Sequence, residues 1–350
     1  MAKKRVTLAD VARLAGVSQT AASFVLSGRR EDMRISADVE ARVLHAVRVL
    51  GYRPNAVSRS LRTGTTHTIG LVSDTISTAP FAGHLIWGAL DAAREHGYLL
   101  FIAESEGDPE LEQELVQAMV DRQVDGIVLA SMYTRALLPP KSLGERPSIL
   151  LNAVPARPKP IVSVVPDEIE GGRTAARALL EAGHREGIGL IGVGPGRTRT
   201  DSLAAIERFQ GIEEVFTAEG IDIAAAVGCD DWQPHHGWEA THRLLKEVRE
   251  LSALICFNDR LALGAYQALA DAGLRVPDDV SVVSFDDDIY ATWVRPPLTT
   301  VALPHYELGR TAVELLLKEI RGERRPAPGR YRIRMPLRER GSIRPRFHPA

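Results

Sequence analysis

The chain has 350 residues, of which 45% are hydrophobic and 25% charged, and its formal net charge is −2. This length is enough for two or three packed units with their own cores, and the composition excludes a disordered or fibrous protein. The two cysteines, Cys229 and Cys256, lack the spacing of a metal site or a disulfide framework. Both are therefore expected to be small apolar core residues.

Positive charge is concentrated at the N-terminal end. Residues 1–65 contain twelve Lys and Arg against five Asp and Glu, a balance of +7, which leaves −9 for the other 285 residues. A basic head on an acidic body is typical of a polyanion-binding module joined to a part with another task. No stretch has the apolar run of a signal peptide or the ~20 apolar residues of a membrane span. We therefore expect a cytoplasmic protein with no membrane partner.

Residues 1–54 contain the signals of three short helices. The cap and turn signals are, in chain order, Thr7 with Asp10, Gly16, Ser18, Ser36 and Gly51. The apolar residues expected to form the core are Leu8, Val11, Ala12, Ala15, Ala22, Val25, Leu26, Val39, Val43, Val47 and Leu50. A small residue at position 12 and a glycine at position 16 suit a helix-turn-helix, in which the helices cross closely and then turn sharply.

Four segments in the same order and spacing resemble the lactose/galactose-repressor (LacI/GalR) family: VTLADVARLAGVS, GYRPNAVSRSLRTG, ICFNDRLALGAYQALADAGLRVPDDVSVVSFDD and RPPLTTV. The resemblance covers almost the whole chain. It implies a helix-turn-helix DNA-binding domain at 1–54, a hinge helix at 55–65, and an effector-binding and dimerisation domain at 66–343. The implied body has two doubly wound α/β lobes, similar to periplasmic sugar-binding proteins.

The resemblance also implies which residues contact DNA. These residues are Thr7, Ser18, Gln19, Thr20, Ser23, Phe24, Asn55, Ser58 and Leu61. In the family, the leucine that matches Leu61 wedges into the minor groove. An inserted leucine would unstack a base step, and a short polar segment of this kind orders only on binding. The alternative for Leu61 is packing against the neighbouring body.

Phe24 departs from the family, in which the matching position is very often arginine. Gln19 can address adenine bidentately and Thr20 can reach a base or a phosphate, whereas Phe24 offers apolar contact only, for instance with a thymine methyl group. The alternative is that Phe24 packs inward against the third helix.

Short β-branched runs alternate with helical stretches along the body, which predicts parallel, doubly wound sheets. The expected strands are Ile69–Val72, Leu99–Ala103, Gly126–Ala130, Ile149–Asn152, Ile161–Val165, Ile188–Gly192, Leu254–Phe257, Val280–Phe285 and Thr299–Leu303. The family's three crossings between lobes are expected near Val165–Asp167, Arg295–Thr299 and Gly322–Pro328. Lobe 1 would then comprise about 66–165 and 299–325, and lobe 2 about 167–295 and 328–343.

Residues just past strand ends are the candidates for a ligand site in the cleft between the lobes. Together with the family match they are Ala79, Pro80, Asn152, Arg208, Trp232, Asn258, Asp286 and His305. An arginine with carboxylate and amide groups suits adjacent hydroxyls, and an indole face suits a sugar ring. Without the family match, each would be read as a cap or a loop-stabilising group. Leu303 replaces a glutamine that sugar-binding relatives can have.

Other sites are less well supported. The segment Asp230–His236 crowds acids and histidines into one loop with no second ligand cluster, so no metal is expected. The glycines of residues 192–196 lack the spacing of a nucleotide loop, no cofactor is expected, and no nucleophile motif is present, so the chain is not expected to be an enzyme.

These features predict a transcriptional regulator, a repressor, that binds a pseudo-palindromic double-stranded operator as a homodimer and responds to a small-molecule effector, a sugar. Two alternatives remain open. One is a sugar-binding protein without a regulatory role, and the other is a nucleoside or other metabolite that acts as co-repressor.

Overall fold

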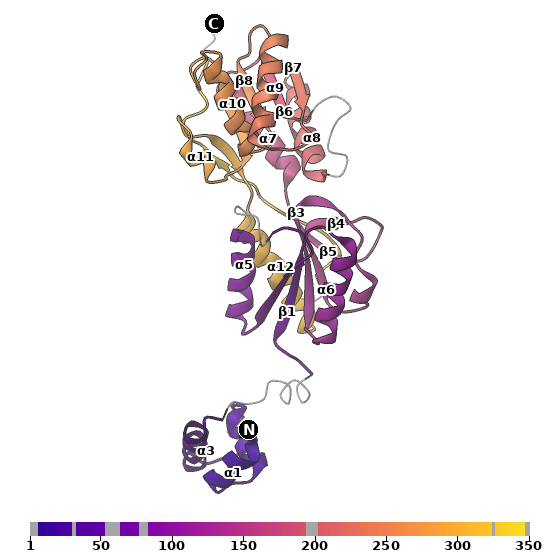
Figure 1. Cartoon of the computed structure of the whole chain (residues 1–350), viewed down its shortest axis with the longest axis vertical. Coiled ribbons are helices and arrows are strands. Elements are labelled where there is room, and N and C mark those ends of the chain that lie inside the picture. The colour runs from indigo at the N-terminus through magenta and orange to yellow at the C-terminus, as the bar shows by residue number, and fades with distance from the viewer. Residues whose placement is uncertain are drawn as a thin grey trace. The chain divides into compact units, whose positions relative to one another are not determined.

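A computed structural model of the chain describes residues 6–29, 33–52, 64–76, 83–193, 202–323 and 326–346. The chain forms two compact units, Met1–Thr66 and His67–Ala350, each with its own core (Figure 1). The division between them falls one residue after the predicted hinge, 55–65. Within the described residues, no helix is both long enough and apolar enough to cross a membrane.

The N-terminal unit contains three helices around a small core. The helices are α1 (Leu8–Ala15), α2 (Gln19–Leu26) and α3 (Ala37–Leu50). Thr7, Ser18 and Ser36 cap them as predicted, and Gly16 and Gly51 end α1 and α3 with φ values of 65° and 60° that favour glycine. The buried residues are Val11, Ala12, Ala15, Ala22, Val25, Val43 and Ala46. Ala46 was not predicted, whereas Val39 is only partly buried.

The first sheet of the body has the strand order β11-β5-β4-β3-β1-β2, and its paired strands are parallel. Its strands are β1 (Thr68–Ser73), β2 (Leu99–Glu104), β3 (Gly126–Leu137), β4 (Ser148–Pro155), β5 (Val162–Pro166) and β11 (Gly329–Ile333). Its helices are α5 (Gly83–Glu95), α6 (Pro109–Asp121), the short η1 (Lys141–Leu143) and α12 (His305–Ile320). Along β3, alternate residues face two separate cores, with Val128 packing with α5 and α12 and Ile127 with α6, because side chains alternate across a sheet.

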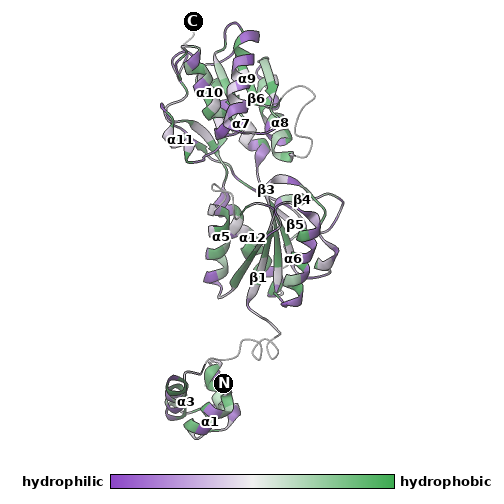
Figure 2. Cartoon of the chain, viewed as in Figure 1, coloured by the Kyte–Doolittle hydropathy of each residue, from purple (hydrophilic) through white to green (hydrophobic). Residues whose placement is uncertain are grey.

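The second sheet has the order β12-β10-β9-β8-β6-β7, parallel except for β12. Its strands are β6 (Ile188–Gly192), β7 (Ile223–Gly228), β8 (Ala253–Cys256), β9 (Ser281–Asp286), β10 (Thr299–Ala302) and β12 (Leu337–Arg338). Its helices are α7 (Glu168–Glu181), α8 (Leu203–Ala218), α9 (Pro234–Glu247), α10 (Asp259–Asp271) and α11 (Tyr290–Trp293). The strands of both sheets are mainly hydrophobic and the helices are two-sided (Figure 2). The body is thus two doubly wound α/β lobes, as predicted.

All nine predicted strands are present, but two of the predicted lobe crossings are wrong. The first crossing lies between β5 and α7, at Pro166 and Asp167, where it was expected. The second follows β10 rather than preceding it, because Thr299 pairs with Val283 of β9 in the second sheet. The third follows β11, which pairs with β5 in the first sheet.

The lobe boundaries therefore change. Lobe 1 holds β1 to β5, α12 and β11, and lobe 2 holds α7 to β10 and β12. The predicted ranges are therefore wrong at two places: residues 299–302 belong to lobe 2 and residues 329–333 to lobe 1. The prolines before β10 interrupt the sequence pattern, although the chain stays in lobe 2 there. The half-exposed, arginine-rich β11 has no apolar run that would identify it as a strand.

Candidate functional site

The start of α2 exposes the predicted base-reading residues. The Ser18 hydroxyl accepts a hydrogen bond from the Ala21 amide at 3.1 Å, so its side chain caps the helix. Gln19 and Thr20, the first two residues of α2, are both exposed. Thr7 caps α1, and its hydroxyl donates to Asp10 Oδ2 at 2.6 Å. Of these side chains, those of Gln19 and Thr20 are exposed and not used in a helix cap.

Phe24 is half-buried, and it is not among the hydrophobic side chains that pack against the core of the described part of the head. The guanidinium carbon of Arg29 lies 5.6 Å from the centre of its ring. This arrangement is a cation–π contact at the surface. It favours an apolar contact surface over inward packing against α3.

Several predicted residues lie outside the described part of the chain. They are Asn55, Ser58 and Leu61 of the predicted hinge, and Ala79 and Pro80, which follow β1 in the sequence. Their roles stay predictions.

A cavity of about 200 Å³ lies between the two lobes of the body. Lobe 1 contributes Met132, Tyr133, Thr134 and Asn152 to its lining. The lining residues from lobe 2 and from the second crossing are Glu168, Ser202, Ala204, Arg208, Asp231, Trp232, Gln233, Asn258, Arg260, Asp286 and Leu303. The structure therefore brings together five of the predicted effector residues. They are Asn152 within β4, Arg208 on α8, Trp232 after β7, Asn258 between β8 and α10, and Asp286 at the end of β9.

Arg208, on α8, is 2% exposed and held on several sides. Its Nε and Nη2 donate to the two oxygens of Glu168 at 2.6 and 3.3 Å, and its Nη1 donates to the carbonyl of Phe257 at 2.5 Å. Its guanidinium carbon lies 4.6 Å from the ring centre of Phe285 and 5.8 Å from that of Trp232. A buried guanidinium is stable only with such paired donors, so its position is fixed before any ligand binds.

Asp286, the last residue of β9, faces the same guanidinium. Its Oδ1 lies 3.5 Å from Arg208 Nη2, and its side chain is 18% exposed. Burial raises the pKa of Asp286 well above its ordinary value, and Arg208 partly offsets this. Burial alone would lower the pKa of Arg208, but Glu168 and Asp286 raise it above its ordinary value, so the guanidinium stays charged. Because part of its side chain is exposed to the cavity, the Asp286 carboxyl group can accept a hydrogen bond there whether or not it is protonated.

Asn152, Asn258 and Trp232 line the cavity with part of their polar capacity already used. The Asn152 amide donates to the carbonyls of Ser131 and Met132 at 3.0 Å, and its oxygen accepts from the Thr134 hydroxyl at 2.7 Å. Asn258 caps α10 through the Leu261 amide at 2.8 Å. Asn258 therefore caps a helix and Asn152 bonds to a neighbouring strand, which are the structural roles given above as the alternative to effector binding.

Trp232 keeps its ring in place through one polar contact. Its Nε1 donates to the carbonyl of Gly192 at 3.2 Å, and its ring meets Phe257 edge-on with 5.9 Å between the ring centres. Because the indole N–H is satisfied within the protein, what the side chain can offer a ligand is the face of the ring.

His305 is not in this cavity. It lines a second cavity of about 750 Å³ with His84 and Tyr306, and the two cavities share Arg260, Asp286 and Leu303. Its Nδ1 is buried and has no hydrogen-bond partner in the described part of the chain. Burial, with His84 and Arg208 nearby, lowers the pKa of His305 to about 4, so the imidazole is neutral at pH 7.

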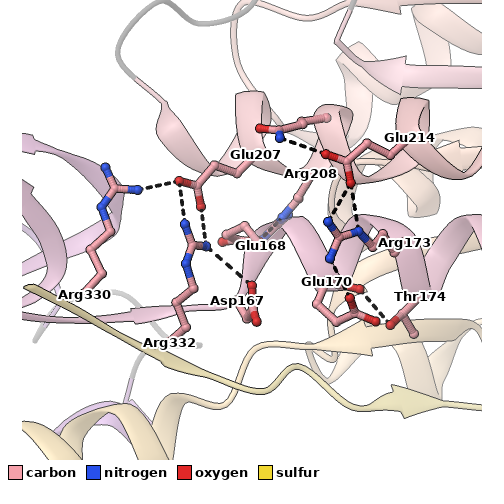
Figure 3. Close-up of polar contacts among 11 residues, drawn as sticks. Asp167, Glu168, Glu170, Arg173, Thr174, Glu207, Arg208, Glu214, Arg330 and Arg332 are labelled. Atoms are coloured by element: carbon pink, nitrogen blue, oxygen red, sulfur yellow. Dashed lines mark hydrogen bonds and ion pairs between the residues drawn. The ribbon is translucent and has the colours of Figure 1, made fainter.

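Two acidic residues were missed by the sequence analysis. Glu168 is 1% exposed and forms the bidentate pair with Arg208 (Figure 3). Glu207 accepts from Arg330 and Arg332. A glutamate in the first turn of a helix resembles an ordinary dipole-stabilising residue, so nothing local distinguished Glu168. The described residues contain no group of three or more His, Cys, Asp or Glu arranged to hold a metal ion.

Known proteins match the chain along most of its length. The model for bacterial regulatory proteins of the lacI family matches residues 7–55, and that for a periplasmic binding protein-like domain matches residues 176–343. The HTH-type transcriptional repressor PurR of Haemophilus influenzae is 34% identical over 90% of this chain and 91% of its own length. The ribose operon repressor of Escherichia coli is 32% identical over 96% and 99%.

The structural comparison agrees. The lac repressor dimer bound to operator and the anti-inducer ONPF superposes with a TM-score of 0.79 at 26% identity, over 97% of this chain and 100% of that chain. The helix-turn-helix head, the two lobes and the two relatives above 30% identity lead to one conclusion: the chain belongs to the lacI family of bacterial regulatory proteins.

Proposed function

We propose that this protein is a transcriptional repressor whose operator affinity is controlled by a small neutral polyhydroxylated molecule, a sugar, bound in the cavity at Arg208. The observation that carries the proposal is the pre-positioned Arg208 guanidinium beside the partly exposed Asp286 carboxylate. An N–H donor and a carboxylate acceptor close to each other match the adjacent hydroxyls of a sugar. The Trp232 ring supplies an apolar face for the ring of the sugar.

The charge of the cavity favours a neutral ligand. Arg208 is offset by Glu168 and Asp286, and Asp231 also lines the cavity with Arg260. A phosphorylated effector would bring negative charge to carboxylates that are already close together.

A nucleoside is the second candidate because Trp232 and Phe285 flank Arg208 with aromatic rings. Calorimetry of the full chain against monosaccharides, with ribose first, and nucleosides tests both. Binding of a monosaccharide that Asp286→Asn weakens supports the proposal. Binding of nucleosides alone would assign the site to the second class, and sugar affinity that is the same in Asp286→Asn and the wild type would refute the proposed contact.

Homodimerisation through one face of the body is part of the proposal. Trp87 and Leu90 on α5 are 58% and 41% exposed, and Trp293 on α11 is 63% exposed. Both helices lie on the left-hand edge of the body in Figure 1. Exposed apolar groups of this size mark interaction surfaces, and two heads on a two-fold axis suit a pseudo-palindromic operator. Sedimentation of Trp87→Glu should show monomers, and a dimer of unchanged affinity would contradict this surface.

DNA recognition follows from the exposed start of α2. Selection of operator sequences from a random pool should recover a pseudo-palindrome with the full chain, and Phe24→Arg should change base preference at one position in each half-site. Unchanged preference would mean that Phe24 does not meet a base. A protein that binds operator DNA acts in the compartment that holds the DNA, which agrees with the expected cytoplasmic location. None of the proposed roles requires turnover of the ligand.

A further inference from the structure

An ion-pair cluster joins the two lobes close to the effector cavity (Figure 3). Glu207 lies on α8 of lobe 2. Its Oε1 accepts from Arg330 Nη1 at 2.6 Å and from Arg332 Nη2 at 3.3 Å, and its Oε2 accepts from Arg332 Nη1 at 3.0 Å. Both arginines lie on β11, which pairs with β5 in the sheet of lobe 1. These contacts therefore cross from one lobe to the other.

The cluster lies at two of the three crossings. Asp167 connects β5 to α7, its amide donates to the carbonyl of Ile333 at 2.8 Å, and its Oδ1 lies 3.4 Å from Arg332 Nη1. Arg330 and Arg332 are two residues apart on β11 and so project from the same face of the strand. Two arginines thus meet two carboxylates close to the two places where the chain passes from lobe 1 to lobe 2.

The burial of Glu207 makes its ion pairs important for the arrangement of the lobes. The Glu207 side chain is 9% exposed, whereas those of Arg330 and Arg332 are 40% and 30% exposed. A carboxylate with so little access to water needs its cationic partners. Rotating lobe 2 away from β11 would leave Glu207 without them, so the contact favours one arrangement of the lobes.

Glu207 is also the chain neighbour of Arg208, the central residue of the cavity. The two side chains leave α8 in different directions, Arg208 toward Glu168 within lobe 2 and Glu207 toward β11. The helix itself is held rigidly against α7, because a Cβ at Gly172 or Gly211 would come within about 2 Å of the facing backbone. Any movement of α8 and α7 together relative to lobe 1 would therefore also move Glu207 relative to β11.

We propose that Glu207, Arg330 and Arg332 form an interlobe latch that holds the lobes in the described arrangement and sets how strongly effector binding at Arg208 changes operator affinity. The second half of this proposal rests on the proposed function. The first half does not, because lobe arrangement can be measured without an effector or DNA.

The first test measures the distance between the lobes in the full chain. Spin labels at Glu114→Cys on α6 and Glu247→Cys on α9, two exposed positions, report it by pulsed electron resonance, and the native Cys229 and Cys256 are buried. Labelled chain is diluted with unlabelled chain so that each dimer carries at most one labelled copy. Glu207→Gln should broaden the distance distribution or shift it to a new population.

Glu214→Gln is the matched control. Glu214 is on the same helix and accepts from Arg173 and Gln210, both in lobe 2, so its loss should leave the distance unchanged. Should Glu207→Gln fail to fold, Arg330→Gln carries the same test from the more exposed side of the pair. A distribution unchanged in both Glu207→Gln and Arg330→Gln would overturn the latch.

The second test measures coupling. With ribose, or the sugar that calorimetry identifies, the ratio of operator affinities without and with sugar should fall by roughly five-fold or more in Glu207→Gln, a typical size for allosteric coupling. An unchanged ratio beside a changed lobe distance would refute the coupling role alone. Absence of any response in the wild type would refute the proposed function and leave the distance result standing.

Discussion

The two walls of the effector cavity differ in what they offer a ligand. The lobe 2 wall carries Arg208 and Asp286, a charged donor and acceptor that face each other. The lobe 1 wall carries Asn152, whose amide and carbonyl groups are bonded to the neighbouring strand β3. We therefore expect lobe 2 to bind the effector by directional hydrogen bonds and lobe 1 to cover it.

Arg208→Ala should have the largest effect. It removes the main donor of the lobe 2 wall and leaves Glu168 buried without its partner, which costs about 3–5 kcal/mol of unfolding free energy. Calorimetry should find no effector binding, and denaturant unfolding should show the lower stability. Arg177→Ala, which removes an exposed arginine of lobe 2 paired with Glu170, is the control and should change neither quantity appreciably. If Arg208→Ala binds the effector with wild-type affinity, the lobe 2 wall does not bind the ligand more directly than the lobe 1 wall.

Acid should destabilise the protein through His305, a titratable group on the lobe 1 side. Its pKa is lowered to about 4 in the folded chain by burial and by the nearby His84 and Arg208, against an ordinary value of 6.5. The unfolded chain therefore binds the proton first as the pH falls, so stability is lost between about pH 6.5 and pH 4, by up to about 3 kcal/mol. Unfolding measured across this range should be flatter in His305→Gln, and an identical pH profile in the variant would contradict the assignment.

Asp286→Asn should weaken binding while the wall keeps its shape. The substitution exchanges a charged acceptor for a neutral one, which costs about 1.5–3 kcal/mol, or roughly ten-fold or more in the effector Kd. Asp278→Asn, an exposed carboxylate of lobe 2 paired with Arg344, is the matched control. If both variants bind the effector equally well, Asp286 is not an effector ligand.

On the lobe 1 wall, Asn152→Ser should lower the stability of the protein more than it lowers the affinity for the effector. It removes the bonds to Ser131, Met132 and Thr134, so the unfolding free energy should fall by about 1–2 kcal/mol. The effector Kd should change by less than the roughly ten-fold expected at Asp286. A larger loss of affinity than in Asp286→Asn would show that lobe 1 binds as directly as lobe 2.

Much of the fold could be predicted because its signals are local. The caps at Thr7, Ser18 and Ser36 and the apolar strands each depend on a few consecutive residues. The strand β11 could not be predicted, because its alternating arginines are explained only by a carboxylate more than a hundred residues away on α8.

The site was predictable in part for the same reason. Arg208 and Asp286 followed from their places on the chain and the family match, and both line the cavity. Which polar groups remain available to a ligand depends on contacts between distant segments. The internal bonds of Asn152 to Thr134 and the pairing of Glu168 with Arg208 therefore became visible only in the structure.

Control of DNA binding by a sugar at Arg208 can be measured in the full chain. The operator affinity is followed by fluorescence anisotropy with increasing sugar, in the wild type and in Arg208→Ala. A sugar that binds the wild type should change its operator affinity by roughly ten-fold or more. Arg208→Ala should bind the operator as the sugar-free wild type does and ignore the sugar. An operator affinity indifferent to every sugar that binds, or the same response in Arg208→Ala, would contradict control by a sugar at Arg208.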